Sequence, residues 1–408
     1  MKNYFNPQLI LILTIPILIT PVVAYGANPQ HLEQLKTTNA CPGCDLTDAN
    51  LITANLQEAD LSGANLNNAK LNNVNLTRAN LSGAELRGVE LSGANLTGAN
   101  LKQAKLGAIQ QNNKIVVAKL LNANLQEADL SNAELNSAQL NYANLVKTNL
   151  EGANLTATKL SGANLSGANL KTAKMEIADI STANLTGAKM NGANLDKING
   201  DGANFSNVDL SQAYLANANL SGAILKGANL ENTVLIAANL QIADLSGANL
   251  KGSVLKGAGF NRANLTGANL ENADLTNGKF AIANLTNANL NGAILQFAYL
   301  YNANLSKANL NGVDLKDSRL RGADLTGASL VGATLEGASL ISAQLTGANL
   351  TYTNLKKCDF REANLTGANL SYANLSQADF QLAALADVNF NGANLSEANF
   401  QGAVGLNP

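Results

Sequence analysis

Leucine recurs at every fifth position along almost the whole chain, and a small residue, most often alanine, lies two positions before each leucine. The segments 54–56 and 393–395 both read Ala-Asn-Leu, so the pattern is the same near the two ends. Residues five apart are separated by about 140° around an α-helix and lie on opposite faces of a flat strand. The period therefore predicts a chain that turns a corner in every repeat and winds into a solenoid.

Each repeat has two positions that we expect to point inward: the leucine, which we call the centre, and the small residue two before it, position −2. Centres recur every five residues from Leu46 to Leu106, which makes 13 repeats, and from Leu120 to Phe400, which makes 57. No centre or −2 residue in either run carries a formal charge. Because an unpaired buried charge is very costly, this distribution predicts one continuous core.

The residue after the centre, position +1, has a longer period. In every fourth repeat from Gln126 to Ala386, 10 of the 14 residues at +1 are Ser or Thr. Phe260 and Phe280, both at centres, are also 20 residues apart. We therefore expect four repeats per 20-residue coil, with equivalent side chains stacked. The serine and threonine column, which we call the hydroxyl ridge, includes Thr266, Thr286, Ser306, Thr326, Thr346 and Thr366.

The A-(N/D)-L-x-x run resembles the pentapeptide-repeat family over about residues 45–403. The resemblance implies an all-β fold, the right-handed quadrilateral β-helix. Stacking at the strand spacing of about 4.8 Å would make the 70 repeats a rod of roughly 85 Å. The layout of the N-terminus is similar to that of exported, signal-peptide-bearing members, a type common in cyanobacteria.

The repeat is interrupted once, between Leu106 and Leu120, at residues 107–119. We expect the segment from Gly107 to Lys114 to be extruded from the coil, with Ile115 as a candidate centre at which the core resumes. A tolerated surface insertion and a binding loop are both compatible with this segment, since surface loops accept changes of length at small cost.

Residues 1–26 have the pattern of a secretory signal peptide. Lys2 precedes an apolar run over residues 9–24, and small residues follow. The run is short for a membrane-spanning helix, although a retained anchor is the alternative. We expect export to the periplasm, the thylakoid lumen or the extracellular space, with no stable membrane anchor after cleavage.

Residues 27–44 are predicted to cap the first coil with a short helix that ends near Thr38. Asn28 and Pro29 suit the N-cap and first helical positions. Cys41 and Cys44 follow, and in an exported protein we expect them to form a disulfide. Two free thiols are the main alternative. A redox or metal role is disfavoured because the βαβ context of redox CxxC motifs is missing.

Candidate chemistry is sparse. The sequence predicts no catalytic, cofactor-binding or metal-binding residues, and therefore not an enzyme. His31 is the only histidine and belongs to the expected cap, and Cys358 occupies a −2 position, where we expect it to be buried. Lys and Arg total 27 and Asp and Glu 29, so neither a basic stripe for nucleic acid nor a strongly acidic face is indicated. Asp and Asn share the position before the centre, −1, which favours corner hydrogen bonding over acid–base work.

Two surfaces are candidates for binding. The first is the hydroxyl ridge, which suits a repetitive ligand such as a polysaccharide or ice. The second, which we call the apolar face, has apolar residues at +1 and +2 of an adjacent column of repeats. Its members are Leu121, Tyr142, Ile242, Ile282, Tyr301, Ile341 and Leu382. The leading hypothesis is a non-enzymatic, rod-shaped scaffold or adaptor that binds an unidentified protein through such a face.

The two ends of the rod are predicted to differ. No second cap follows Phe400, and residues 404–408 form only a short tail. Because an exposed last coil presents unpaired strand edges, we expect a second copy or a partner to cover the C-terminal coil. Some members of the family bind topoisomerases by resembling DNA. That function needs a strongly acidic face and a cytoplasmic protein, so the near-neutral charge and the signal peptide disfavour it here.

Overall fold

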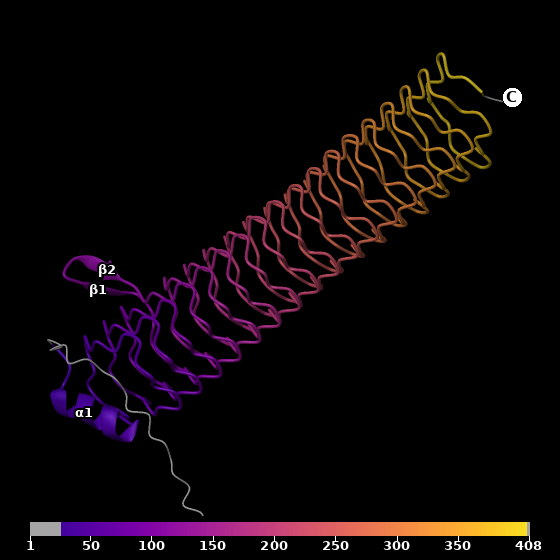
Figure 1. Ribbon diagram of the computed structural model, residues 1–408. Coiled ribbons are helices and arrows are strands. Elements are labelled where there is room, and N and C mark those ends of the chain that lie inside the picture. The colour runs from indigo at the N-terminus through magenta and orange to yellow at the C-terminus, as the bar shows by residue number, and fades with distance from the viewer. Residues whose placement is uncertain (1–25, 406–408) are drawn as a thin grey trace, which may run out of the picture.

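The structure is a computed structural model that describes residues 26–405. It is a straight rod, with helix α1 (Pro29–Thr38) at one end and a hairpin of β1 (Ile109–Gln111) and β2 (Lys114–Val116) projecting from its side (Figure 1). Asn28 is the N-cap of α1, as predicted. The predicted signal peptide and most of the predicted tail lie outside the described residues.

The rod is a right-handed quadrilateral β-helix with four repeats per coil. Residues at −1 form isolated parallel bridges with the residue 20 positions further on, such as Asn249 with Asn269. The core phenylalanines stack accordingly: the ring centroids of Phe260 and Phe280 are 4.8 Å apart, with an interplanar angle of 6°. The predicted coil of four repeats and its stacked rings are confirmed.

Backbone hydrogen bonds join each coil to the next. The N–H of Leu245, a centre, donates to the carbonyl oxygen of Asn264 in the next coil at 2.7 Å, and the N–H of Asn264 donates back to Ala243 at 2.9 Å. In a third bond, the N–H of Gly247 donates to the carbonyl oxygen of Thr266 at 3.0 Å. Repetition of this set satisfies most backbone polar groups without any continuous strand.

The corner of each repeat requires a left-handed residue at position +2. Gly247 has φ of 64° there, and Tyr142 has φ of 60°. Glycine and asparagine adopt this conformation at the lowest cost, which explains their frequency at +2. Side chains at +2 lean over the next coil: a Cβ added to Gly162 would lie 2.5 Å from the ring of Tyr142. Glycine at +2 therefore also makes room for a large neighbour.

The core consists of the centre and −2 side chains, as predicted. Leu245 has no exposed surface, and neither has Ile198, which occupies a −2 position two residues before a glycine at the centre. The free thiol of Cys358 is also completely buried at −2, and it donates to the carbonyl oxygen of Leu335 at 2.9 Å. Burial raises the pKa of this thiol well above its usual range.

Asn and Asp at −1 form side-chain ladders along the corners. The Asn249 side chain donates from Nδ2 to Asn229 Oδ1 at 3.2 Å, and its own Oδ1 accepts from Asn269 Nδ2 at 3.1 Å. The same Oδ1 accepts the backbone N–H of Lys251 at 3.3 Å, which closes the turn. The interpretation of the −1 residues as corner hydrogen-bonding groups agrees with these contacts.

The two residue types differ in one respect. Asp209 accepts from Asn229 Nδ2 at 3.1 Å, but it bridges Lys189, which offers no amide oxygen, in the preceding coil. Asp244 likewise follows Ile224. A carboxylate only accepts, so at these two positions it starts a ladder, whereas asparagine can both donate and accept and continues it. Asp129 and Asp324 follow an asparagine and do not fit this pattern.

The interruption leaves the register of the coils intact. Across it, the separation of bridged residues rises from 20 to 29, as between Glu90 and Lys119. The prediction that Ile115 is a centre was wrong, because it lies in β2, pairs with Gln110 and is 76% exposed. Ala118 is buried, so the core resumes there. The chain leaves the coil as a hairpin because neighbouring coils can stack only if they match.

We predict that Leu245→Asp and Asn249→Asp differ sharply in cost. The first buries a charge at a fully buried centre and should cost more than about 4 kcal/mol, since truncating a buried leucine alone costs about 2–5 kcal/mol. The second removes two donated hydrogen bonds, to Asn229 at 3.2 Å and to Glu231 at 3.5 Å, and should cost about 1–2 kcal/mol. Urea denaturation followed by circular dichroism measures both. Asp209→Asn is the control and should change stability by less than about 0.5 kcal/mol. Equal losses from the first two variants would contradict the inward and outward assignment.

We predict that Cys358 resists alkylation in the folded protein. A buried thiol with a raised pKa supplies almost no thiolate, so iodoacetamide at pH 8 should modify it only in urea. Mass spectrometry measures the extent of modification. In the matched control, a cysteine replaces the exposed Glu362 in a Cys358→Ala background and should react within minutes without urea. Rapid labelling of native Cys358 would refute this description of the core.

Candidate binding surfaces

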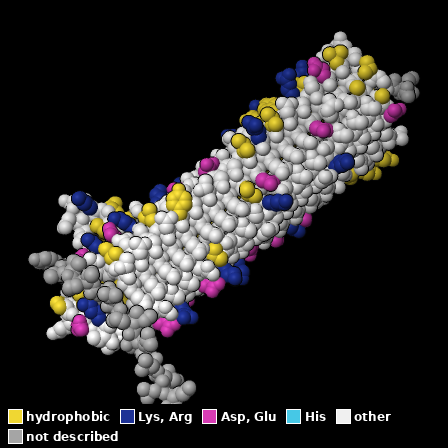
Figure 2. Space-filling view, viewed as in Figure 1, with side chains coloured by type: hydrophobic (Ala, Val, Ile, Leu, Met, Phe, Trp, Pro, Cys, Tyr) yellow, Lys and Arg dark blue, Asp and Glu magenta, His cyan; other side chains and the backbone are white. Residues whose placement is uncertain are grey.

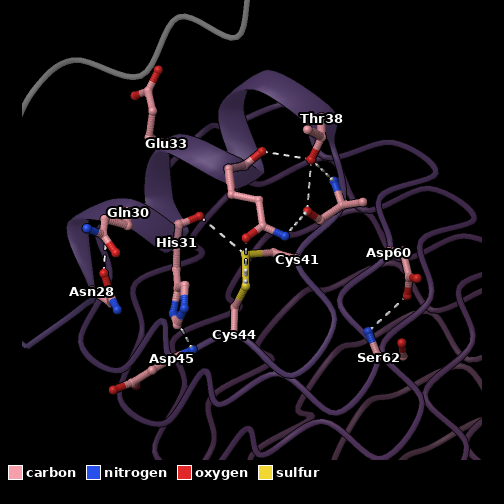
Figure 3. Close-up of a disulfide and its surroundings, with 12 residues drawn as sticks. Asn28, Gln30, His31, Glu33, Thr38, Cys41, Cys44, Asp45, Asp60 and Ser62 are labelled. Carbon is pink, nitrogen blue, oxygen red and sulfur yellow. Dashed lines mark hydrogen bonds between the residues drawn. A yellow bond between two sulfur atoms is a disulfide. The ribbon is translucent and has the colours of Figure 1, made fainter.

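Helix α1 covers the first coil (Figure 3). The backbone N–H of Asn28 donates to the carbonyl oxygen of Asp45 at 3.2 Å, and the N–H of Asp45 donates to His31 Nδ1 at 3.0 Å. Leu35 has no exposed surface and belongs to the core. The single histidine thus serves as a hydrogen-bond acceptor that attaches the cap to the coil.

Cys41 and Cys44 form a disulfide directly after α1, with their Cα atoms 5.3 Å apart (Figure 3). Both cysteines are buried. Over residues 26–405 we find no group of three or more His, Cys, Asp or Glu side chains placed to hold a metal ion. Within the same range, no helix is long and apolar enough to cross a membrane.

The hydroxyl ridge lies on one face of the rod, but most of its hydroxyl groups are engaged. The Thr266 hydroxyl donates to Asn264 Oδ1 at 2.6 Å, and Thr286, Ser306 and Thr366 make the equivalent bond within 2.7 Å. The same bond from a +1 hydroxyl group to the −1 side chain occurs on other faces of the rod, for example from Ser181 to Asp179 and from Thr276 to Asp274. These hydroxyl groups stabilise the corner turns, so the ridge has fewer donors for a ligand than its composition indicates.

Exposure varies along the apolar face. Tyr142, Ile242, Ile282 and Leu382 are all at least 60% exposed, whereas Leu121, Tyr301 and Ile341 are partly buried. Their positions in the coils place all seven on one side of the rod. However, Tyr142 and Ile242 are separated along the axis by coils with only small or polar residues at +2. The face is therefore not one continuous apolar surface, and its members lie closest together in the C-terminal half.

Basic residues on this same side were not singled out from the sequence. Four of the six arginines of the chain lie there, and all four are exposed. One lysine and two tyrosines lie on this side with the four arginines, which gives the set Arg262, Lys279, Tyr299, Tyr301, Arg319, Arg321 and Arg361. Counting residues in steps of 20 would have revealed them. Figure 2 shows basic and hydrophobic side chains together along the upper edge of the C-terminal half of the rod, while much of the visible surface is uncharged.

A shallow pocket of about 240 Å³ lies at the C-terminal end of this region. It is lined by Arg321, Ile341, Arg361, Glu362, Gln381 and Leu382, so it joins two members of the apolar face to two arginines. Arg361 is held by Asp359, whose Oδ2 is 2.7 Å from Arg361 Nη2. The pocket is therefore of mixed charge, unlike the coils immediately N-terminal to it.

Two further clusters, one of exposed tyrosines and one of partly exposed residues, lie on other sides of the rod and were also missed. Tyr352 and Tyr372 stack at 5.0 Å with an interplanar angle of 9° and are about 60% exposed. On another side, Tyr214, Val234 and Val254 occupy successive bridge positions in neighbouring coils. Both clusters result from residues 20 apart, which a search within single repeats does not detect.

Within residues 26–405, no helix covers the C-terminal coil as α1 covers the first coil. Phe390, Leu395 and Phe400 are only partly buried, although the Phe390 ring packs edge-on against Phe380 and Phe400. Within the described residues, none of the centre N–H groups of these three residues donates a backbone hydrogen bond. Among residues 26–405, this end therefore combines partly buried apolar side chains with backbone donors that have no partner.

Comparison with known proteins agrees with this architecture. The pentapeptide repeats family matches residues 44–107, 118–280 and 283–404, in 8 copies. A search of curated proteins finds no match.

Several solved structures are similar. HetL, a pentapeptide repeat protein involved in heterocyst differentiation regulation in Nostoc sp. strain PCC 7120, is 33% identical, covers 55% of this chain and 88% of its own, and has a TM-score of 0.33. A second Nostoc PCC 7120 pentapeptide repeat protein is 31% identical over 25% of this chain and 83% of its own, with a TM-score of 0.21. A pentapeptide repeat protein from the Arabidopsis thaliana thylakoid lumen is 35% identical over 25% and 67%, with a TM-score of 0.21.

TM-scores this low carry no argument about function. The family assignment depends instead on the match along nearly all of the coils and on the four-repeat coil itself. The chain is a member of the pentapeptide repeat family.

Proposed function

We propose that this protein is a non-enzymatic, rod-shaped scaffold or adaptor that binds another protein through one side of the rod. The observation that carries the proposal is the group of exposed apolar side chains on the apolar face. Ile282 and Leu382 are each at least 60% exposed on a chain whose other outward positions are mostly Asn, Ser, Thr and Gly. Large exposed apolar side chains grouped on one side are typical of interaction surfaces.

The architecture supports this role. The inward positions are filled by the stacked side chains of the core along nearly all of the described coils, so the outward positions are the ones available to a partner. The outward positions are held at fixed steps of about 4.8 Å along a stiff axis. A partner that contacts several coils would therefore meet side chains at set distances, which suits a scaffold.

We propose that the protein is exported, to the periplasm, the thylakoid lumen or the extracellular space. Residues 1–26 have the pattern of a signal peptide but lie almost entirely outside the described residues. The Cys41–Cys44 disulfide supports the proposal, because disulfides persist mainly in oxidising compartments.

A repetitive-ligand function through the hydroxyl ridge is the second candidate. It is less favoured because the hydroxyl groups of Thr266, Thr286, Ser306 and Thr366 donate to corner residues of their own chain. The DNA-mimic function remains disfavoured, since the formal net charge of the chain is only −2.

We predict that a photo-crosslinking amino acid at Ile282 captures a protein partner in the native compartment. The same amino acid at Thr266, on the hydroxyl ridge, is the control. The adaptor proposal expects one predominant protein adduct from position 282 and none from position 266, as measured by gel shift and mass spectrometry. Equal adducts from both positions, or none from either, would refute binding through the apolar face.

We also propose that two copies associate through the C-terminal coil. The partly buried apolar side chains of this coil support the proposal, as do its three centre N–H groups, which donate no backbone hydrogen bond within the described residues. Light scattering should show a mass that rises with concentration toward twice that of the single chain, and Leu395→Glu should abolish the rise. Val404→Glu, at the described end of the chain but outside the core, is the control. A single-chain mass at every concentration would contradict the proposal.

A further inference from the structure

Four exposed cations lie on the same side of the rod as the apolar face, and they add a positive charge to that surface. We call Arg262, Lys279, Arg319 and Arg321 the basic patch. Lys279, Tyr299 and Arg319 occupy successive bridge positions in three neighbouring coils, and Arg321 directly follows the centre of the repeat that contains Arg319. All four cations are exposed. The patch therefore extends along the axis over four coils.

Arg319 is positioned by an aromatic ring of the preceding coil. Its guanidinium carbon lies 4.9 Å from the centre of the Tyr299 ring, a cation–π contact. Tyr301 is the main cause of a pKa of Arg319 that is raised above its usual value, and like any arginine this group stays charged. A guanidinium that is already positioned loses less freedom when it binds an anion, and its planar fork matches a carboxylate.

The charges of the patch are not neutralised. Among the residues described, no acidic side chain lies within 4.0 Å of a patch cation, although ion pairs occur elsewhere on the rod. No outward position on this side is acidic from Arg262 through Arg321. The nearest acidic residue along the chain, Asp317, belongs to the neighbouring side of the rod. Grouped like charges repel one another, so an anion bound here would relieve repulsion as well as gain attraction.

Apolar groups lie among these cations. Ile282 is 62% exposed and occupies the +2 position in the coil after Arg262. Ile341 lies beside Arg321 in the lining of the shallow pocket. A ligand complementary to this surface would carry both carboxylates and apolar groups. A uniform polyanion would make no apolar contact with the isoleucines. It would also be repelled by Asp359 and Glu362 at the C-terminal end of the surface.

We propose that the basic patch binds an extended, acidic segment of a partner protein, with carboxylates at the four cations and apolar side chains against Ile282 and Ile341. The inference rests on the proposed adaptor function and specifies the chemistry of its partner. Lys279 and Arg319 are two coils apart, about 9.6 Å. A polyproline II segment returns to the same side every three residues, or about 9 Å. Acidic residues three positions apart would therefore match the spacing.

The test uses the full mature chain and a defined probe. The probe is a fluorescein-labelled peptide of four Glu-Leu-Pro units, and fluorescence anisotropy measures its affinity. Arg319→Glu combined with Arg321→Glu should weaken binding at least tenfold, and Ile282→Ala severalfold. Lys171→Glu combined with Lys189→Glu makes the same change in net charge on the opposite side and should change affinity less than twofold. Circular dichroism checks that each variant is folded.

Four results would overturn the inference. Equal weakening by both double variants would show that only net charge matters. Tighter binding of heparin than of the peptide, with the same sensitivity to the Arg319 and Arg321 changes, would show a polyanion site. No peptide binding, together with a protein adduct at position 282, would refute the acidic segment while the adaptor function stands. No binding and no adduct would refute both.

Discussion

The structure depends on the requirement that each coil match the next. Centre N–H groups donate to the −1 carbonyl groups of the following coil, and the inward side chains of the two coils stack in the same step. Neither interaction can form if extra residues stay within the stacked part of one coil. This requirement explains why the β1–β2 hairpin lies outside the rod: Glu90 still bridges Lys119 in the next coil, so the extra residues between them must leave the stack.

The period of five was sufficient to predict the inward positions, because burial and backbone pairing repeat with the same period. Cys358 and Ile198 could be placed in the core from their register alone. Ile115 was wrongly predicted to be a centre because its apolar side chain resembles that of a centre in sequence. In the structure, Ala118 and Leu120 fill the inward positions at which the coil resumes, so Ile115 lies outside the core. The difference between Asn and Asp at −1 was also missed, because it depends on the residue one coil earlier rather than on the neighbours in sequence.

The candidate surfaces were harder to predict than the core. Their residues are brought together across coils, and the offset at the hairpin changes the spacing from 20 to 29 at one place. A search for apolar residues alone found Ile282 and Tyr301 but not the cations around them. The serine and threonine column was correctly placed on one face, yet its hydroxyl groups largely serve the turns, which composition could not show.

The cap on the first coil has a consequence for assembly. Because α1 covers the first coil, the coil of a second copy cannot stack directly on that coil. A contact that stacks coil on coil is therefore blocked at this end of the rod. A short helix of ten residues thus gives the two faces at which a coil could stack a different chemistry, and it fixes a direction for the whole rod.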